Sequence, residues 1–137
     1  PGIPHAVVPY RGLQEADENE LRELGRKIRW YADFPKGANV NFYEIIGEDL
    51  VCERTFERGV EDFTYACGTG TGSVVTVLTL QGRVSGKDVR VTMPGGELRI
   101  DAERVYSHIA SLYLTGPTNI VCKGEITDED LPPIPGM

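Results

Sequence analysis

An uncharged segment after a glycine-rich turn constrains the fold of this chain more than any other feature. Residues 73–80 are Ser, Val, Val, Thr, Val, Leu, Thr and Leu, and no side chain among them carries a charge. Their Val and Thr content favours a strand, whereas the preceding glycines and the following Gly82 are typical of the ends of a helix. Because burial on all sides outweighs a small propensity cost, we predict a helix that a sheet encloses.

The rest of the chain predicts short strands and one outer helix. Asp17, followed three residues later by Glu20, resembles an N-cap, and apolar residues at helical spacing predict an amphipathic helix over residues 17–31. A strand begins at Val40 and ends before a turn at residues 47–48. Further strands are predicted at residues 50–56, 88–93, 97–100, 111–114 and 120–125.

The charge balance and the cysteine count restrict the expected partners. Fourteen Lys and Arg against 21 Asp and Glu give a net charge of -7, which argues against a nucleic-acid partner. No apolar stretch approaches the roughly 20 residues that span a bilayer, so no membrane partner is expected. Cys52, Cys67 and Cys122 are odd in number and far apart, which fits neither a disulfide framework nor a zinc site. We therefore expect a cytoplasmic protein without a metal.

The ends of the chain bear on its domain organisation. A length of 137 residues predicts one domain. The chain begins with Pro1 rather than Met and reads like the middle of a longer protein, and its acidic, Pro-rich end resembles a frayed terminus. We expect one domain over residues 1–126 and a frayed tail over residues 127–137.

The clearest chemical feature is a thiol directly before the glycine-rich turn, in residues 66–72 (Ala-Cys-Gly-Thr-Gly-Thr-Gly). The backbone N–H groups of such a turn point at one spot, and the helix dipole adds partial positive charge there. An anion would bind beside Cys67, and the same field favours its thiolate form, which makes it a candidate for proton exchange. The plain alternative is an inert buried cysteine. Dinucleotide and phosphate-loop interpretations are weak, because neither the glycine spacing nor a following Lys fits.

Residues 57–59 (Glu-Arg-Gly) lie at the end of a predicted strand, from which the chain returns to Cys67. Glu57 could accept a proton from the thiol or hold a substrate ammonium group, and Arg58 could pair with a substrate carboxylate. From chemistry alone, a solvated pair at a hairpin end is the favoured interpretation. Cys52 and Cys122 lie in strand patterns and are expected to be small buried hydrophobes. Three further residues also have plain explanations. We expect His108 to lie at the surface, and we expect Trp30 and Tyr31 to pack against the rest of the protein.

Six short motifs occur in one order along the chain. They are residues 2–5 (Gly-Ile-Pro-His), 38–42 (Ala-Asn-Val-Asn-Phe), 57–62 (Glu-Arg-Gly-Val-Glu-Asp), 66–70 (Ala-Cys-Gly-Thr-Gly), 94–96 (Pro-Gly-Gly) and 114–117 (Leu-Thr-Gly-Pro). This order resembles the C-terminal half of diaminopimelate epimerase, over residues 2 to about 126. The resemblance implies an α+β fold in which a barrel-like, mostly antiparallel β-sheet wraps around a central helix, with one outer amphipathic helix. It also implies a second, similar half, with the active site between the two.

The resemblance implies a cofactor-independent epimerase that interconverts LL- and meso-diaminopimelate in lysine and cell-wall synthesis. Two cysteines act from opposite faces of the substrate α-carbon, of which Cys67 is one and the other belongs to the missing N-terminal half. Glu57 would assist Cys67, and His5 would approach the other thiol. The implied substrate-binding groups are the N–H groups of Gly68 and Thr69 for the α-carboxylate, Arg58 for the distal carboxylate and Asn39 for the distal end. No cofactor is implied, and a homodimer is possible.

Two positions depart from the family pattern and leave alternatives open. Ile3 stands where many members carry an Asn that contacts substrate, and Phe63 stands where an acidic residue is usual. One alternative is half of a related fold member that isomerises another small carboxylate. Another is a non-catalytic carboxylate-binding domain. We expect the chain to be inactive on its own, because one thiol serves only one face of the substrate.

Overall fold

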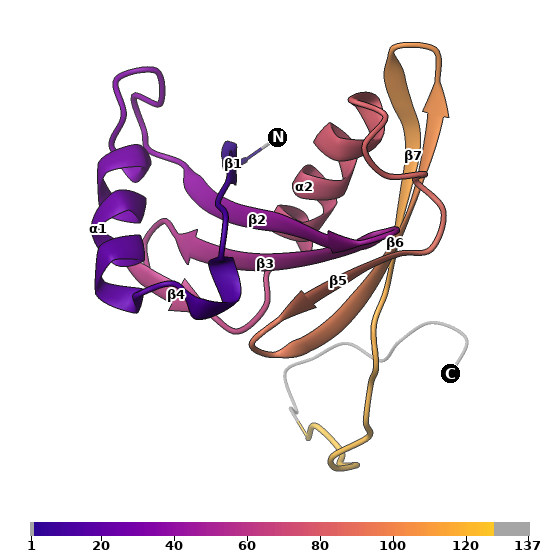
Figure 1. Cartoon of the computed structure of the whole chain (residues 1–137). Helices are drawn as coiled ribbons and strands as arrows, with labels where there is room; N and C mark the ends of the chain where they lie inside the picture. Colours follow the sequence, from indigo (N-terminus) through magenta and orange to yellow (C-terminus); the bar gives the residue numbers. More distant parts are fainter. Residues whose placement is uncertain (1, 128–137) are drawn as a thin grey trace.

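The computed structural model describes residues 2–127, which form a curled sheet with two helices (Figure 1). The elements are β1 (His5–Pro9), η1 (Leu13–Glu15), α1 (Glu18–Arg29), β2 (Asn39–Gly47), β3 (Leu50–Glu57), β4 (Asp62–Thr64), α2 (Gly68–Leu80), β5 (Val89–Met93), β6 (Gly96–Val105) and β7 (His108–Thr115). The strand order is β1-β2-β3-β5-β6-β7, and β4 pairs with β3. The β1–β2 and β3–β5 pairs are parallel and the other pairs are antiparallel. The predicted fold class, a mostly antiparallel sheet around a central helix with one outer helix, is confirmed.

The two helices cover opposite faces of β2 and β3 (Figure 1). Because side chains alternate between the faces of a strand, the residues of one strand divide between two cores. The core under α1 contains Val40, Phe42 and Phe56 with Leu21 of the helix. The core under α2 is built from ten buried side chains, which are Tyr43, Val51, Val74, Val75, Leu78, Val84, Val89, Val91, Ile100 and Ala102. Strands β2 and β3 are therefore the wall shared by both cores.

Helix α2 is the predicted buried helix, and its first and last turns explain its bounds. It begins at Gly68, five residues before the predicted start at Ser73, because the glycine-rich turn is itself the first helical turn. Gly82 has a φ of 69° and its N–H donates to the Thr79 oxygen, so the predicted C-terminal glycine cap is confirmed. Within residues 2–127, no helix is long and apolar enough to cross a membrane.

Helix α1 begins as predicted, since the Asp17 carboxylate accepts the Glu20 N–H at 2.9 Å. It ends at Arg29, two residues before the predicted end. Packing of Trp30 and Tyr31 was a wrong prediction, because their side chains are 65% and 59% exposed. The Arg29 guanidinium instead lies 3.9 Å from the centre of the Trp30 ring.

Several strand predictions need correction. The short strands β1 and β4 and the turn η1 were not predicted. Residues 120–125 are not a strand, because they pair with no neighbour and Ile120 and Val121 are 82% and 91% exposed. Cys122 in this segment is exposed, so the prediction of a buried side chain was wrong there, whereas Cys52 is buried as predicted. His108 is exposed at the start of β7, as expected. The predicted frayed tail lies outside the described residues except for Thr127.

Candidate functional site

Cys67 is the N-cap of α2. Its backbone is extended (φ -141°, ψ 101°), and its carbonyl accepts the Thr71 N–H at 2.9 Å. The Sγ atom is half-buried and lies 3.6 Å from Thr69 Oγ1. Gly68 and Thr69 are exposed, and the N–H groups at the start of a helix have no acceptor within the helix. The thiol and a set of free backbone donors therefore share one accessible end of α2, where the helix dipole is positive.

Gly70 allows the first turn of α2 to lie directly on β2. A Cβ atom at this position would collide with Oδ1 of Asn41 and would lie 3.3 Å from the Cys67 sulfur. Gly70 is therefore required by close packing. Asn41, fully buried on β2, and the thiol of Cys67 lie on either side of the same glycine.

His5 on β1 is joined to this cluster by Asn41. The Asn41 side-chain N–H₂ group donates to the Ala6 carbonyl at 3.1 Å, which fixes the orientation of the amide, and lies 3.1 Å from His5 Nδ1. Nδ1 of His5 is therefore the acceptor, and the proton of the neutral ring sits on Nε2. Burial lowers the pKa of His5, and the charge of Glu57 opposes this effect. The ring is thus neutral at pH 7.

The Glu57-Arg58 turn follows β3 and is held by its backbone. The Glu57 carbonyl accepts the Glu61 N–H at 2.8 Å, and Gly59 has a φ of 92°, a value that favours glycine. The Arg58 N–H donates to the Asn39 side chain at 2.8 Å. The guanidinium of Arg58 donates to the Lys36 carbonyl at 2.9 Å. Asn39 is thus buried, contacts Arg58 and pairs with His5 of β1.

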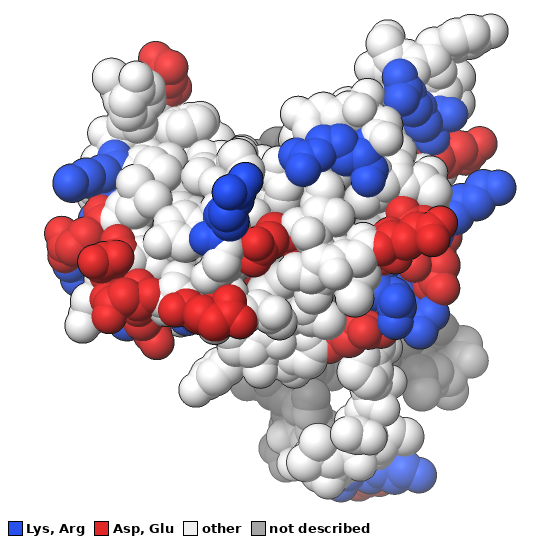
Figure 2. All heavy atoms as spheres, in the orientation of Figure 1, with Lys and Arg blue, Asp and Glu red and all other residues white. Residues whose placement is uncertain are grey.

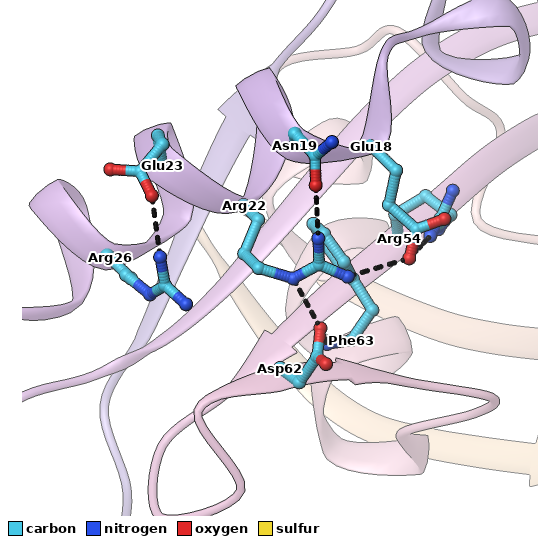
Figure 3. Close-up of polar contacts among 8 residues, drawn as sticks. All are labelled: Glu18, Asn19, Arg22, Glu23, Arg26, Arg54, Asp62 and Phe63. Carbon is cyan, nitrogen blue, oxygen red and sulfur yellow. Dashed lines mark hydrogen bonds and ion pairs between the residues drawn. The ribbon is translucent and has the colours of Figure 1, made fainter.

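Two arginines of α1 anchor the same turn. Arg22 bonds Asp62 at 2.9 Å, as Figure 3 shows, and Arg29 bonds Glu61 at 2.8 Å. The hydrogen bond from Arg22 lowers the pKa of Asp62. Figure 2 shows acidic side chains gathered on the side of the molecule where α1 lies. The acidic pair that ends the 57–62 motif therefore fixes the turn to the outer helix.

Phe63 has a structural explanation. Its ring lies 5.7 Å from the Phe56 ring and beneath the guanidinium groups of Arg54 and Arg22, at 4.6 and 6.0 Å from the ring centre. Figure 3 shows Arg22 reaching across this ring to Asp62. The aromatic ring thus occupies the α1 side of the sheet and not the thiol side, where Cys67 lies.

A row of buried polar side chains beneath α2 was not predicted as part of the site. Thr55 donates to Asn41 Oδ1 at 3.0 Å, and Thr71 donates to Glu53 at 2.8 Å. Glu53 is only 1% exposed. The signal was present in the sequence, because polar residues alternate at 39 and 41 and again at 53, 55 and 57, on the strand face that should be apolar.

The predicted site residues form two sets of contacts, which are joined because His5 of β1 pairs with Asn39 of β2. Cys67, Gly68 and Thr69 lie at the start of α2, with His5 joined to them through Asn41. Arg58, which follows β3, and Asn39, at the start of β2, form the second set. Arg58 also lines a cavity of about 200 Å³ with Gly2, Pro4, Asp33, Phe34, Lys36 and neighbouring residues. Glu57 acts on His5 through its charge. No three His, Cys, Asp or Glu side chains of the described residues gather as metal ligands.

Comparison with known proteins identifies the relatives of this chain. The family model described as diaminopimelate epimerase matches residues 1–121. The diaminopimelate epimerase of Aquifex aeolicus is 40% identical over 132 residues, which are 95% of this chain and 45% of that protein. The diaminopimelate epimerase of Chlorobaculum tepidum is 42% identical over 128 residues, which are 92% of this chain and 48% of that protein. The chain thus spans a little less than half the length of these relatives.

A solved structure supports the fold. The crystal structure of a PhzF-family phenazine biosynthesis protein from Bacillus anthracis superimposes with a TM-score of 0.56 and covers 82% of this chain and 34% of that chain. The sequence identity is 18%, so this likeness concerns the fold alone.

Proposed function

The chain belongs to the diaminopimelate epimerase family, and from this premise we propose that it is the C-terminal half of a cofactor-independent epimerase. The proposed reaction interconverts LL- and meso-diaminopimelate, in lysine and cell-wall synthesis in the cytoplasm. The proposed domain is residues 1–126. The observation that carries the proposal is the position of Cys67 as the N-cap of α2, beside exposed backbone donors.

In the proposed reaction, a thiolate removes the α-proton of the substrate and a thiol on the other face returns one. Cys67 supplies one of these groups, and the missing N-terminal half supplies the other. The N–H groups of Gly68 and Thr69 hold the α-carboxylate and stabilise the negative charge that develops when the α-proton leaves. Reversal of the two roles gives the reverse reaction, and each turnover leaves one thiol and one thiolate exchanged.

His5 and Glu57 have supporting roles in this proposal. A neutral His5, whose Nδ1 accepts from Asn41, would approach the thiol of the other half with its Nε2–H and donate a hydrogen bond to the thiolate form of that group. Glu57 assists proton transfer at Cys67. The negative charge of Glu57 also favours the protonated form of His5, so a change in that charge would change the pKa of His5.

Arg58 and Asn39 are proposed to bind the distal end of the substrate. The guanidinium of Arg58 has the planar donor geometry that pairs with a carboxylate, and its bond to the Lys36 carbonyl keeps it at the mouth of the cavity. The side-chain oxygen of Asn39 already accepts the Arg58 N–H, so its free N–H₂ group is the part that would face a ligand.

A second candidate is half of a related enzyme that isomerises another small carboxylate. Ile3, 41% exposed, favours it, because a side chain without hydrogen-bonding groups stands where many members carry the substrate-contacting Asn. A binding domain without catalysis is a third interpretation. A homodimer stays a prediction.

The test compares Cys67→Ser with Cys122→Ser in the full-length protein that contains this chain. Formation of meso-diaminopimelate from the LL isomer should fall by about 100-fold or more in Cys67→Ser, since a positioned acid or base contributes this much. Cys122 is exposed and remote in the sequence, and its substitution should leave the rate unchanged. Full activity in Cys67→Ser would disprove the proposed role of the thiol. Turnover of another carboxylate in place of diaminopimelate would favour the second candidate.

A further inference from the structure

A carboxyl group without a cationic partner is buried beneath the first turn of α2. Glu53 on β3 is 1% exposed, and none of the ion pairs among residues 2–127 involves it. An unpaired carboxylate in such a place is costly. Burial accordingly raises the pKa of Glu53 to about 7. The proposed epimerase chemistry assigns this residue no role.

Two threonine hydroxyls contact the two oxygens of Glu53. Thr71 Oγ1 lies 2.8 Å from Glu53 Oε2 and 3.0 Å from the carbonyl oxygen of Cys67. Thr55 Oγ1 lies 3.2 Å from Glu53 Oε1 and 3.0 Å from Asn41 Oδ1. A hydroxyl has a single proton to donate. Each threonine therefore has two acceptors in reach and can serve one of them at a time.

The proton of Glu53 decides which acceptors are served. An ionised Glu53 has acceptors only, and its charge attracts both hydroxyl protons, away from Asn41 and the Cys67 carbonyl. A neutral Glu53 can donate its own proton to Thr71 Oγ1, whose hydroxyl then turns to the Cys67 carbonyl. Thr55 is then free to donate to Asn41. The two states direct the same hydroxyl protons toward different acceptors.

Both of the competing acceptors belong to the site. The Cys67 carbonyl closes the first turn of α2, and Asn41 holds Nδ1 of His5 at 3.1 Å. We propose that Glu53 is a positioning residue whose proton sets the hydrogen bonds that Cys67 and Asn41 receive. The consequence for catalysis rests on the proposed function, which gives Cys67 and His5 their roles. The exchange of hydrogen bonds around Glu53 does not depend on the proposed function.

Other titratable groups face Glu53 from the neighbouring elements and must be distinguished from it. On β2 the register partner is Tyr43, whose hydroxyl accepts from Arg83 at 3.0 Å. Cys67 lies at the start of α2, and Glu57 lies on the same face of β3, two residues beyond Thr55. From β1, His5 contacts Asn41 directly, so a signal of Asn41 follows His5 as well as Glu53. On β5, Thr92 pairs with Cys52, the residue before Glu53, and Val91 pairs with Val51, and neither β5 side chain is titratable.

The test is a pH titration of the full chain by carbon-detected NMR. The side-chain carboxyl carbon of Glu53 should shift with a midpoint of about 7. The carbonyl carbon of Cys67 and the side-chain carbonyl carbon of Asn41 should each show a step at that midpoint. Glu53→Gln should abolish both steps and leave the His5 titration in place. Glu103→Gln is the matched control, because this exposed carboxylate also accepts a hydroxyl, from Ser111 at 2.9 Å, but lies on β6.

Two further variants test the hydrogen bonds of Thr71 and Thr55 separately. Thr71→Val should remove the step of the Cys67 carbonyl and keep that of Asn41, whereas Thr55→Val should do the reverse. A Glu53 midpoint near the ordinary value of 4.5 would overturn the proposal. Flat Cys67 and Asn41 signals across the Glu53 titration would overturn it equally. Loss of epimerase activity in Cys67→Ser with flat signals would retain the proposed function and reject this inference.

Discussion

The two ends of helix α2 lie in opposite kinds of surroundings. Toward the C-terminal end, Val75 and Leu78 are fully buried among apolar side chains of the sheet. At the N-terminal end, Gly70 and Thr71 lie on Asn41 and Glu53, which are equally buried but polar. Strands β2 and β3 therefore change from hydrophobic core to functional site within a few residues.

This difference indicates how the fold presents its chemistry. Burial of the apolar end stabilises the position of the helix, because each large side chain contributes about 1.5–3 kcal/mol. The polar end gains less, since its hydrogen bonds mainly offset the cost of removing polar groups from water. A helix held firmly at one end can thus present Cys67 at the other end, where the packing is less favourable.

Truncation at the apolar end should have the largest effect on stability. Leu78→Ala removes a fully buried side chain and should lower the free energy of unfolding by about 2–5 kcal/mol. Val77→Ala is the control on the same helix, since Val77 is only half-buried and should cost less. Urea denaturation of the three proteins measures this. Equal losses in the two variants would contradict the view that α2 is anchored on this face.

The polar end should make stability depend on pH through Glu53. Its pKa is about 7 in the folded chain and 4.5 when unperturbed, so the folded state binds more protons between these values. Stability should therefore fall as the pH rises from 4.5 to 7, by about 3 kcal/mol in total, and then level off.

Glu53→Gln provides the comparison for this pH dependence. The variant should lack the fall between pH 4.5 and 7 and should be more stable than the wild type at pH 8. Thermal unfolding at a series of pH values checks both statements. Identical pH profiles for the two proteins would show that Glu53 is ionised at little cost.

Substitution of two glycines near the start of α2 should cost different amounts of stability. Gly70→Ala places a Cβ against Asn41 Oδ1, whose amide is fixed by hydrogen bonds, and should cost about 1–3 kcal/mol. Gly72→Ala places a Cβ 2.7 Å from the Cδ2 methyl of Leu112, which is 44% exposed and can move, so the loss should be smaller. Denaturation midpoints compare the two. The reverse order would mean that Asn41 is not held rigidly beneath the turn.

The three cysteines should differ clearly in their rates of alkylation, and this prediction involves the smallest effect on the fold. At neutral pH, iodoacetamide should label Cys67 faster than the exposed Cys122, because Cys67 lies beside exposed backbone donors at the start of α2. Cys52 should be slowest, since it is buried and burial raises its pKa. Mass mapping after limited labelling gives the order. Faster labelling of Cys122 would remove the electrostatic advantage assigned to Cys67.

Much of this fold was predictable from patterns that lie within a few consecutive residues. The Asp17 cap fixed the start of α1, and the uncharged segment from residue 73 identified the enclosed helix. The end of that helix followed from Gly82. The short strand β4 was missed because three residues carry too little pattern. Residues 120–125 were misassigned, because apolar content alone does not say whether a neighbouring strand is present.

The site was predictable only where residues lie close in the sequence. The turn after Cys67 and the Glu57-Arg58 pair are local motifs, and their positions were anticipated. The contacts of Asn41 with His5 and Gly70 join three elements, so no local pattern contains them. The alternation of polar residues on β3 marks Glu53, but it does not reveal the partner Thr71, which lies 18 residues away on α2.

The most direct test of the account is deuterium uptake at the α-carbon of diaminopimelate in heavy water. A full-length protein that joins this chain to the proposed second half should exchange the α-proton, since the proposed mechanism places one thiol on each face of the substrate. The chain of residues 1–137 alone and full-length Cys67→Ser should not exchange it at a useful rate, because each lacks one of the two thiols. Exchange by the isolated chain, or full exchange in Cys67→Ser, would contradict the two-thiol mechanism with Cys67 at the start of α2.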